Sequence, residues 1–91
     1  MNNKVLVSVE IPEIGLSYDV FLPVNEQVWK ISKLLSKVVS DLSGANLSTK
    51  DNYVFINKNN GDIYPSNEIV ANTDIRNGTE LTLLKTNVNQ Q

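Results

Sequence analysis

The segment 70–84, VANTDIRNGTELTLL, is the part of the sequence that decides the fold. In it a core aliphatic residue, Val70, is followed five positions later by another, Ile75. Asn77-Gly78 then supplies turn chemistry, because both residue types tolerate the backbone conformations that tight turns need. Residues 80–84 alternate polar and apolar side chains, which predicts a strand. The segment therefore predicts an aliphatic anchor, a turn and a final strand.

A β-hairpin is predicted at the start of the chain. Apolar residues recur with period two in segments 5–11 and 16–22, as in half-buried strands. Residues 12–15, which include a proline and a glycine, provide the turn between them. The side chains expected to point into the core are Val5, Val7, Val9, Ile11, Leu16, Tyr18, Val20 and Leu22.

From Asn25 the period changes to that of a helix. Asn25 is expected to be the N-cap, because its side-chain oxygen can accept a free N–H of the first turn. Gly44 is expected to end the helix in the left-handed conformation. Seven apolar residues fall within an arc of roughly 140° and are expected to face the sheet: Val28, Ile31, Leu34, Leu35, Val38, Val39 and Leu42.

The remaining elements complete an α+β architecture. A strand is predicted at 53–56, a turn at 57–61, a very short strand at 62–64 and a short helical turn after Pro65. A helix with one apolar stripe must bury it on the only sheet available. We therefore predict a β-grasp roll of order ββαβ(β)β, with a mixed sheet and the final strand beside the first. The domain should span 1–85, with a flexible polar tail at 86–91.

Composition excludes several classes of function. The 91-residue chain has a net charge of −2 and contains no cysteine and no histidine. It therefore lacks thiolate chemistry, the commonest general base and the commonest metal ligands. The acidic balance does not suit a nucleic-acid binder, and no stretch is long enough to insert into a membrane. With no visible secretory signal, we expect a cytoplasmic, non-enzymatic protein without cofactor or metal.

The chain resembles a ubiquitin-like domain between residues 4 and 84, most clearly in the segment 63–83. Among ubiquitin-like proteins it is most similar to the YukD/EsaB family, which accompanies type VII (ESX/WXG100-type) secretion systems of Gram-positive bacteria. The shared features are the stand-alone size, the segment 56–59 before the turn, and the ending at 74–84. The resemblance implies a cytoplasmic accessory or regulatory protein that contacts a protein component of the secretion machinery.

The sheet face opposite the helix is the first candidate for such a contact. If Val54 and Ile56 point inward, Tyr53 and Phe55 point outward, on the same face as Leu6 and Leu84. We expect Leu6, Phe55 and Leu84, flanked by Tyr53, to form one apolar protein-interaction patch. The alternative is that the third strand presents its other face.

Trp29 and the lysines of the helix are weaker candidates. The single tryptophan could contact a partner, since tryptophan is enriched in interface hot spots. Alternatively, with Asn25 as N-cap, Val24 and Trp29 would occupy the two positions of a hydrophobic staple. Lys30, Lys33 and Lys37 lie on the solvent side and could meet an acidic partner. The alternative is an internally paired face, because Glu26 and Asp41 lie four residues from Lys30 and Lys37.

Two further functions stay open. One is a covalent modifier or carrier, although the printed sequence ends without the Gly-Gly that such proteins use. The other is a structural module that self-associates weakly, through the apolar patch or through strand addition at a sheet edge.

Overall fold

The computed structural model describes residues 3–44, 47 and 52–86 of the chain. Its elements are β1 (Lys4–Ile11), β2 (Leu16–Pro23), α1 (Val28–Ser43), β3 (Tyr53–Asn57), the 3-10 turn η1 (Val70–Asn72) and β4 (Glu80–Lys85). The predicted order of strands and helix is confirmed, but the short strand at 62–64 is reduced to one bridge between Ile56 and Ile63. The expected tail 86–91 lies outside the described residues except for Thr86, whose N–H donates to the Asn52 carbonyl at 2.8 Å.

The four strands form one mixed sheet in the order β2-β1-β4-β3. β1 and β2 are the antiparallel hairpin, with Val7 opposite Val20. β4 runs parallel to β1 and antiparallel to β3, so the predicted neighbourhood of first and last strands is confirmed. β2 and β3 are the two edge strands of this sheet.

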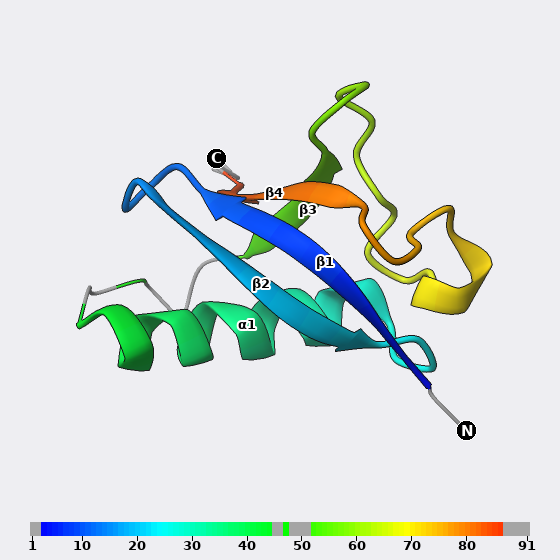
Figure 1. The fold of residues 1–91 in the computed structure, drawn as a ribbon, viewed down its shortest axis with the longest axis horizontal. Helices are drawn as coiled ribbons and strands as arrows, with labels where there is room; N and C mark the ends of the chain where they lie inside the picture. Colours follow the sequence, from blue (N-terminus) through cyan, green and yellow to red (C-terminus); the bar gives the residue numbers. More distant parts are fainter. Residues whose placement is uncertain (1–2, 45–46, 48–51, 87–91) are drawn as a thin grey trace, which may run out of the picture.

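Helix α1 crosses one face of the sheet, and the hydrophobic core lies between the two layers (Figure 1). The sheet supplies Val7, Val9, Phe55, Leu81 and Leu83 to this core, each at most 1% exposed. The helix contributes Val28, Ile31, Leu35 and Val39. Val70 and Ile75, the two aliphatic anchors of the deciding segment, are also buried, as their spacing predicted.

The helix begins later than predicted. Its N-cap is Gln27 rather than Asn25, and Gln27 makes no side-chain capping bond. Two early N–H groups are instead satisfied by the segment before η1: Val28 N–H donates to the Glu68 carbonyl at 2.9 Å, and Trp29 N–H to the Ser66 carbonyl at 3.0 Å. Backbone carbonyls from a distant segment thus accept the hydrogen bonds that a capping side chain would otherwise accept. The helix ends as predicted, with Gly44 in the left-handed region at φ 73°.

The buried face of the helix is also displaced from the predicted arc. Leu34, Val38 and Leu42 are 60%, 40% and 69% exposed, so their expected burial is wrong. Ser32 and Ser36 are buried in their place, and each hydroxyl donates to a backbone carbonyl three residues earlier, at 3.0 and 2.8 Å. Both hydroxyls therefore have a hydrogen-bond partner within the helix, so their burial leaves no polar group unpaired. Because serine side chains are small, this face of the helix can approach the sheet closely.

Candidate protein-interaction surfaces

The outer face of the sheet, away from α1, is built from alternate residues of all four strands. Directly opposed residues in paired strands lie on the same face. The pairing therefore places Leu6 with Phe21, Ser8 with Asp19, and Glu10 with Ser17 on this face, followed across the sheet by Glu80, Thr82, Leu84, Val54 and Ile56. The face is polar in the middle and apolar at both ends.

The expected exposure of Tyr53 and Phe55 is wrong. Phe55 is opposite Leu83 in the β3–β4 pair and is 1% exposed, and Tyr53 is 6% exposed. Both side chains lie beneath α1, so Val54 and Ile56 point outward in their place. The hydroxyl of Tyr53 still reaches the edge of the core, where it donates to Glu13 Oε1 at 3.1 Å. The alternative that strand three presents its other face is the correct one.

Leu6 and Leu84 both face outward, as predicted, but they do not form one patch. The parallel register places Ser8 opposite Glu80, so Leu6 and Leu84 are offset by six positions along the strands. At about 3.3 Å per residue this offset is about 20 Å. Leu6 instead pairs with Phe21, which is 62% exposed, at the far end of the hairpin.

The apolar end of the outer face near β3 is the stronger candidate for protein binding. Val54, Ile56 and Leu84, all partly exposed, are adjacent through the β3–β4 pairing, and Ile63 bridges to Ile56 with 63% of its surface exposed. We call these four residues the β3–β4 patch. Its polar border includes Glu10, whose carboxylate lies 3.4 Å from Lys58 Nζ. An apolar centre with a charged rim is typical of protein interfaces.

Phe21, Val54 and Ile56 are the surface residues that sequence reasoning missed. For Phe21 a signal existed, since alternation in 16–22 makes it a bulky apolar residue at an outward position. For Val54 and Ile56 there was none, because all four residues of 53–56 are apolar and periodicity does not distinguish the faces.

Trp29 does not form the predicted staple, since the N-cap is Gln27 and Trp29 is therefore only the second helical residue. Its indole N–H donates to Gln27 Oε1 at 3.0 Å, and the ring is 44% exposed. The ring borders a shallow hollow of about 410 Å³ between α1 and the start of β3, together with Lys33 and Asn52. Trp29 thus remains a candidate contact residue, on a different surface from the β3–β4 patch.

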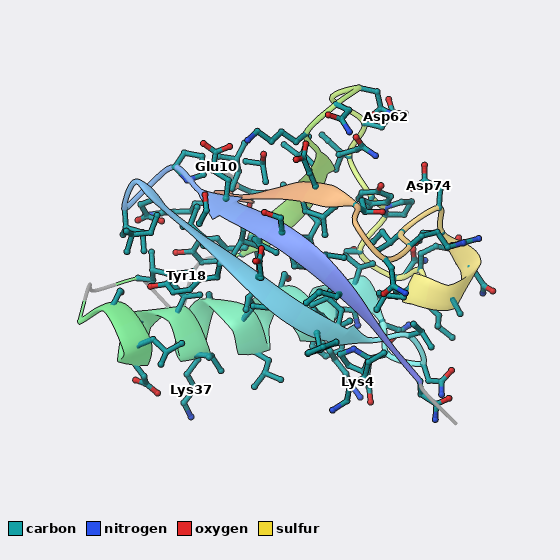
Figure 2. The ribbon with its side chains drawn as sticks, viewed as in Figure 1. Lys4, Glu10, Tyr18, Lys37, Asp62 and Asp74 are labelled. Carbon is teal, nitrogen blue, oxygen red and sulfur yellow. The ribbon has the colours of Figure 1, made fainter. Side chains whose placement is uncertain are left out.

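The solvent side of α1 is only partly paired. Glu26 and Lys30 lie 3.9 Å apart, as the spacing predicted, with both side chains about half exposed. Lys37 projects away from the sheet (Figure 2). Within the described ranges 3–44, 47 and 52–86 it forms no ion pair with Asp41. A lysine that precedes the acid is the less favourable order for such a pair on a helix.

A buried tyrosine links the two loops that flank β3 and β4. The Tyr64 hydroxyl donates to Asp74 Oδ1 at 2.6 Å and accepts from Asn57 Nδ2 at 3.0 Å. Burial raises the pKa of this hydroxyl above its ordinary 10.0, and the Asp74 carboxylate raises it further. A neutral tyrosine held by two partners acts as a structural tie between the loops.

The described residues contain no group of three or more potential metal ligands. Among the described helices, none is long and apolar enough to cross a bilayer.

Comparisons with known proteins agree on the fold. No protein-family model and no curated protein matches the sequence. A chain of the MycP5-free ESX-5 inner membrane complex (State II) is 17% identical, with a TM-score of 0.71; the match covers 99% of this chain and 23% of that one. The UBL domain of Plasmodium falciparum Dsk2 is 17% identical, with a TM-score of 0.68 over 91% of this chain and 99% of that one. A chain of the toluene 4-monooxygenase HD complex with 4-bromobenzoate is 8% identical, with a TM-score of 0.75 and the same coverage.

These likenesses confirm the predicted ubiquitin-like β-grasp fold, with a mixed four-stranded sheet and one helix across it. This chain spans about a quarter of the ESX-5 chain that it matches.

Proposed function

We propose that this chain is a non-enzymatic, cytoplasmic accessory or regulatory protein of a type VII secretion system of the YukD/EsaB kind. It acts by binding a protein component of the secretion machinery. The observation that carries the proposal is the structural likeness to a chain of the ESX-5 inner membrane complex, which covers 99% of this chain.

The β3–β4 patch is the surface that we assign to this contact. A helix that covers one face of a four-stranded sheet leaves the other face available, and the patch brings four apolar residues together at one end of it. Burial of apolar surface contributes roughly 25 cal/mol per Å², so a buried isoleucine contributes about 2 kcal/mol. The rim pair of Glu10 and Lys58 is half exposed and contributes more to orientation than to affinity.

The test is co-purification of the tagged chain from a Gram-positive cell that has a type VII system. Ile56→Asp places a charge in the centre of the patch and is expected to lower partner recovery at least tenfold. The matched control is Ile69→Asp, which changes the same residue type at a site 36% exposed and outside the patch. Thermal unfolding of both variants checks that the fold is retained.

Three results would contradict the proposal. The first is equal recovery of a secretion component with Ile56→Asp and with the unchanged chain. The second is capture of partners unrelated to secretion. The third is a set of higher-mass adducts in intact mass spectra from cells, which would indicate the covalent modifier instead. A parallel Trp29→Ala variant tests the second surface, and loss of recovery with Trp29→Ala alone would move the contact to the helix side.

A further inference from the structure

Among the described residues, none bonds to the outward-pointing backbone groups of β2, so its outer edge is an open row of hydrogen-bonding groups. Val24 N–H donates to the Asn3 carbonyl at 2.8 Å, which makes Asn3 and Val24 a hydrogen-bonded pair of the hairpin. Along an antiparallel pair of strands, hydrogen-bonded residue pairs alternate with pairs that are not hydrogen-bonded to each other. The pairs in phase with it include Val5 with Leu22 and Val7 with Val20, so the backbone groups of Ser17, Asp19 and Phe21 point away from β1.

Hydrogen bonds on the other side of β1 independently support this assignment of which residue pairs are hydrogen-bonded. Gly78 N–H donates to the Leu6 carbonyl at 2.8 Å, and Ser8 N–H donates to the Thr79 carbonyl at 3.1 Å. Leu6 and Ser8 therefore turn their backbone groups toward β4, as residues out of phase with the hairpin bonds must. The same alternation turns their partners on β2 toward solvent.

The two edges of the sheet differ in how far other segments cover their backbone groups. Along β3, the segment after the turn comes back to cover the edge: Asn57 N–H donates to the Asp62 carbonyl at 2.8 Å, and Tyr64 N–H to the Phe55 carbonyl at 3.0 Å. Proteins protect exposed edges with charges, prolines or covering segments, because an open edge pairs readily with another strand. On β2, within the part of the chain that the structure describes, the protecting features are Asp19 and the terminal Pro23.

An apolar surface borders this open edge. A hollow of about 180 Å³ lies between β2 and α1, lined by Val20, Phe21 and Leu22 of the strand and by Ile31, Leu34 and Val38 of the helix. We call these six residues the β2–α1 groove. On the helix side of this groove, Leu34 and Val38 are 60% and 40% exposed, and Leu42 continues the helix stripe at 69%. The Phe21 side chain, 62% exposed, points to the outer face of the same edge strand. In Figure 1, β2 lies on the outer side of β1 and passes close to α1.

The charges beside the groove make it complementary to itself. Lys30 and Asp41 are eleven residues apart, close to three turns, so they lie within about 20° of each other on the border of the stripe. This border therefore carries Lys30 near the start of the helix, Lys37 past its middle and Asp41 near its end, beside the apolar Leu34 and Val38. A second copy turned end over end reads in the opposite order, so each Lys30 would face an Asp41.

We propose that a second copy of this chain docks at the β2–α1 groove, with the two β2 strands antiparallel in one eight-stranded sheet. Centred on Val20, the pairing sets Asp19 opposite Phe21 of the other copy, so that no two carboxylates face each other. Both helices then lie on the same face and run antiparallel, with Leu34 opposite Val38 of the other copy.

The centre of the strand and the centre of the helix fit one two-fold axis. α1 follows β2 after a connection of four residues and runs in the opposite direction to it (Figure 1). Val20 is near the middle of β2, and the midpoint between Lys30 and Asp41 is near the middle of α1. One rotation can therefore satisfy both the strand pairing and the charge pairing.

The test is sedimentation equilibrium of the chain from the low-micromolar to the millimolar range. The apparent mass is expected to rise from 10.1 kDa toward twice that value. Leu34→Glu should keep the mass at 10.1 kDa at all these concentrations, whereas the control Ile63→Glu, at the opposite edge, should dimerise like the unchanged chain. Both residues are about 60% exposed, so circular dichroism should show an unchanged fold.

A charge exchange identifies the antiparallel arrangement. Lys30→Glu and Asp41→Lys should each raise the dimer dissociation constant by roughly fivefold, because two symmetric contacts become repulsive. The double variant should restore the original value. A chain that stays monomeric, a dimer that survives Leu34→Glu, or a double variant that is no better than the single ones would overturn the proposal. So would a monomeric chain whose groove takes up an extended apolar peptide.

Discussion

At the scale of single residues, Phe55 and Ile56 are adjacent in β3 and occupy opposite environments. Phe55 is 1% exposed against Leu83, whereas Ile56 is partly exposed on the outer face. Phe55→Ala should lower the free energy of unfolding by about 3–5 kcal/mol, because it leaves a cavity under the helix. Ile56→Ala, the neighbouring control, should cost about 1 kcal/mol or less. Urea unfolding of the two variants measures both values, and equal losses would contradict the face assignment.

Tyr64 should make stability depend on alkaline pH. Its folded-state pKa is raised above 10.0, so its contribution is complete below about pH 10 and is lost as pH rises through the folded pKa. Tyr64→Phe should lower the free energy of unfolding by about 1–2 kcal/mol at neutral pH, because the bonds to Asp74 and Asn57 are lost. The difference between the two proteins should shrink above pH 10.

Urea unfolding at several pH values measures this difference. Tyr18→Phe serves as the control, because Tyr18 is a partly buried tyrosine of the hairpin, packed against the core. A difference between the unchanged chain and Tyr64→Phe that stayed constant from neutral to strongly alkaline pH would contradict the role of the Tyr64 hydroxyl.

At the scale of elements, helix α1 rests on the sheet through a side that includes two serines. Ser36 is 1% exposed, and a larger side chain there would push the helix away from the sheet. Ser36→Leu should therefore cost about 1–3 kcal/mol of unfolding free energy, although it makes the helix more apolar. Leu42→Ser, the reverse change at a residue 69% exposed, should alter stability by about 0.5 kcal/mol or less. Thermal unfolding distinguishes the two, and stabilisation by Ser36→Leu would contradict the observed rotation of the helix.

The helix and β3 also show where sequence reasoning stops. In 5–11 and 16–22 apolar residues recur with period two, so the inward and outward faces were predictable, although Leu16, expected in the core, is 42% exposed at the start of β2. In 53–56 every residue is apolar, and the choice of face follows from the register with β4, which period alone does not contain. In α1 the apolar arc was wider than the sheet covers, and contacts of Val28 and Trp29 with the Glu68 and Ser66 carbonyls fix its start.

For the candidate site, the outward orientation of residues was predictable, but their separation along the sheet was not. That an outer sheet face would carry apolar residues followed from one helix covering one side, and Leu6 and Leu84 were placed on it correctly. Their separation along the sheet depends on the parallel offset of β1 and β4, a non-local quantity. The same offset divides the face into two ends, one at Leu6 and Phe21 and one at the β3–β4 patch.

At the scale of the whole molecule, the two proposed surfaces lie at opposite edges of one sheet. The order β2-β1-β4-β3 separates the β2–α1 groove from the β3–β4 patch by the two central strands. A dimer through β2 would therefore leave both copies of the patch available, at the two ends of an eight-stranded sheet. Two linked sites raise the apparent affinity for a partner that is itself repeated, without any new contact.

Hydrogen exchange along the whole chain should show this asymmetry between the edges. Amides in β1 bond to strands on both sides and should exchange only through global unfolding. The amides of Ser17, Asp19 and Phe21 point to the open edge, so they should exchange fast in dilute solution and become protected as concentration rises. The amides of Asn57 and Tyr64 are already bonded at the covered edge and should not change.

Leu34→Glu should remove the concentration dependence at β2 and leave β1 and β3 as they were. Protection that instead appeared at β3 with rising concentration would move the self-association to the β3–β4 patch, and the two surfaces would then compete. In that case a secretion partner and a second copy could not bind at once, and Ile56→Asp would abolish both interactions together.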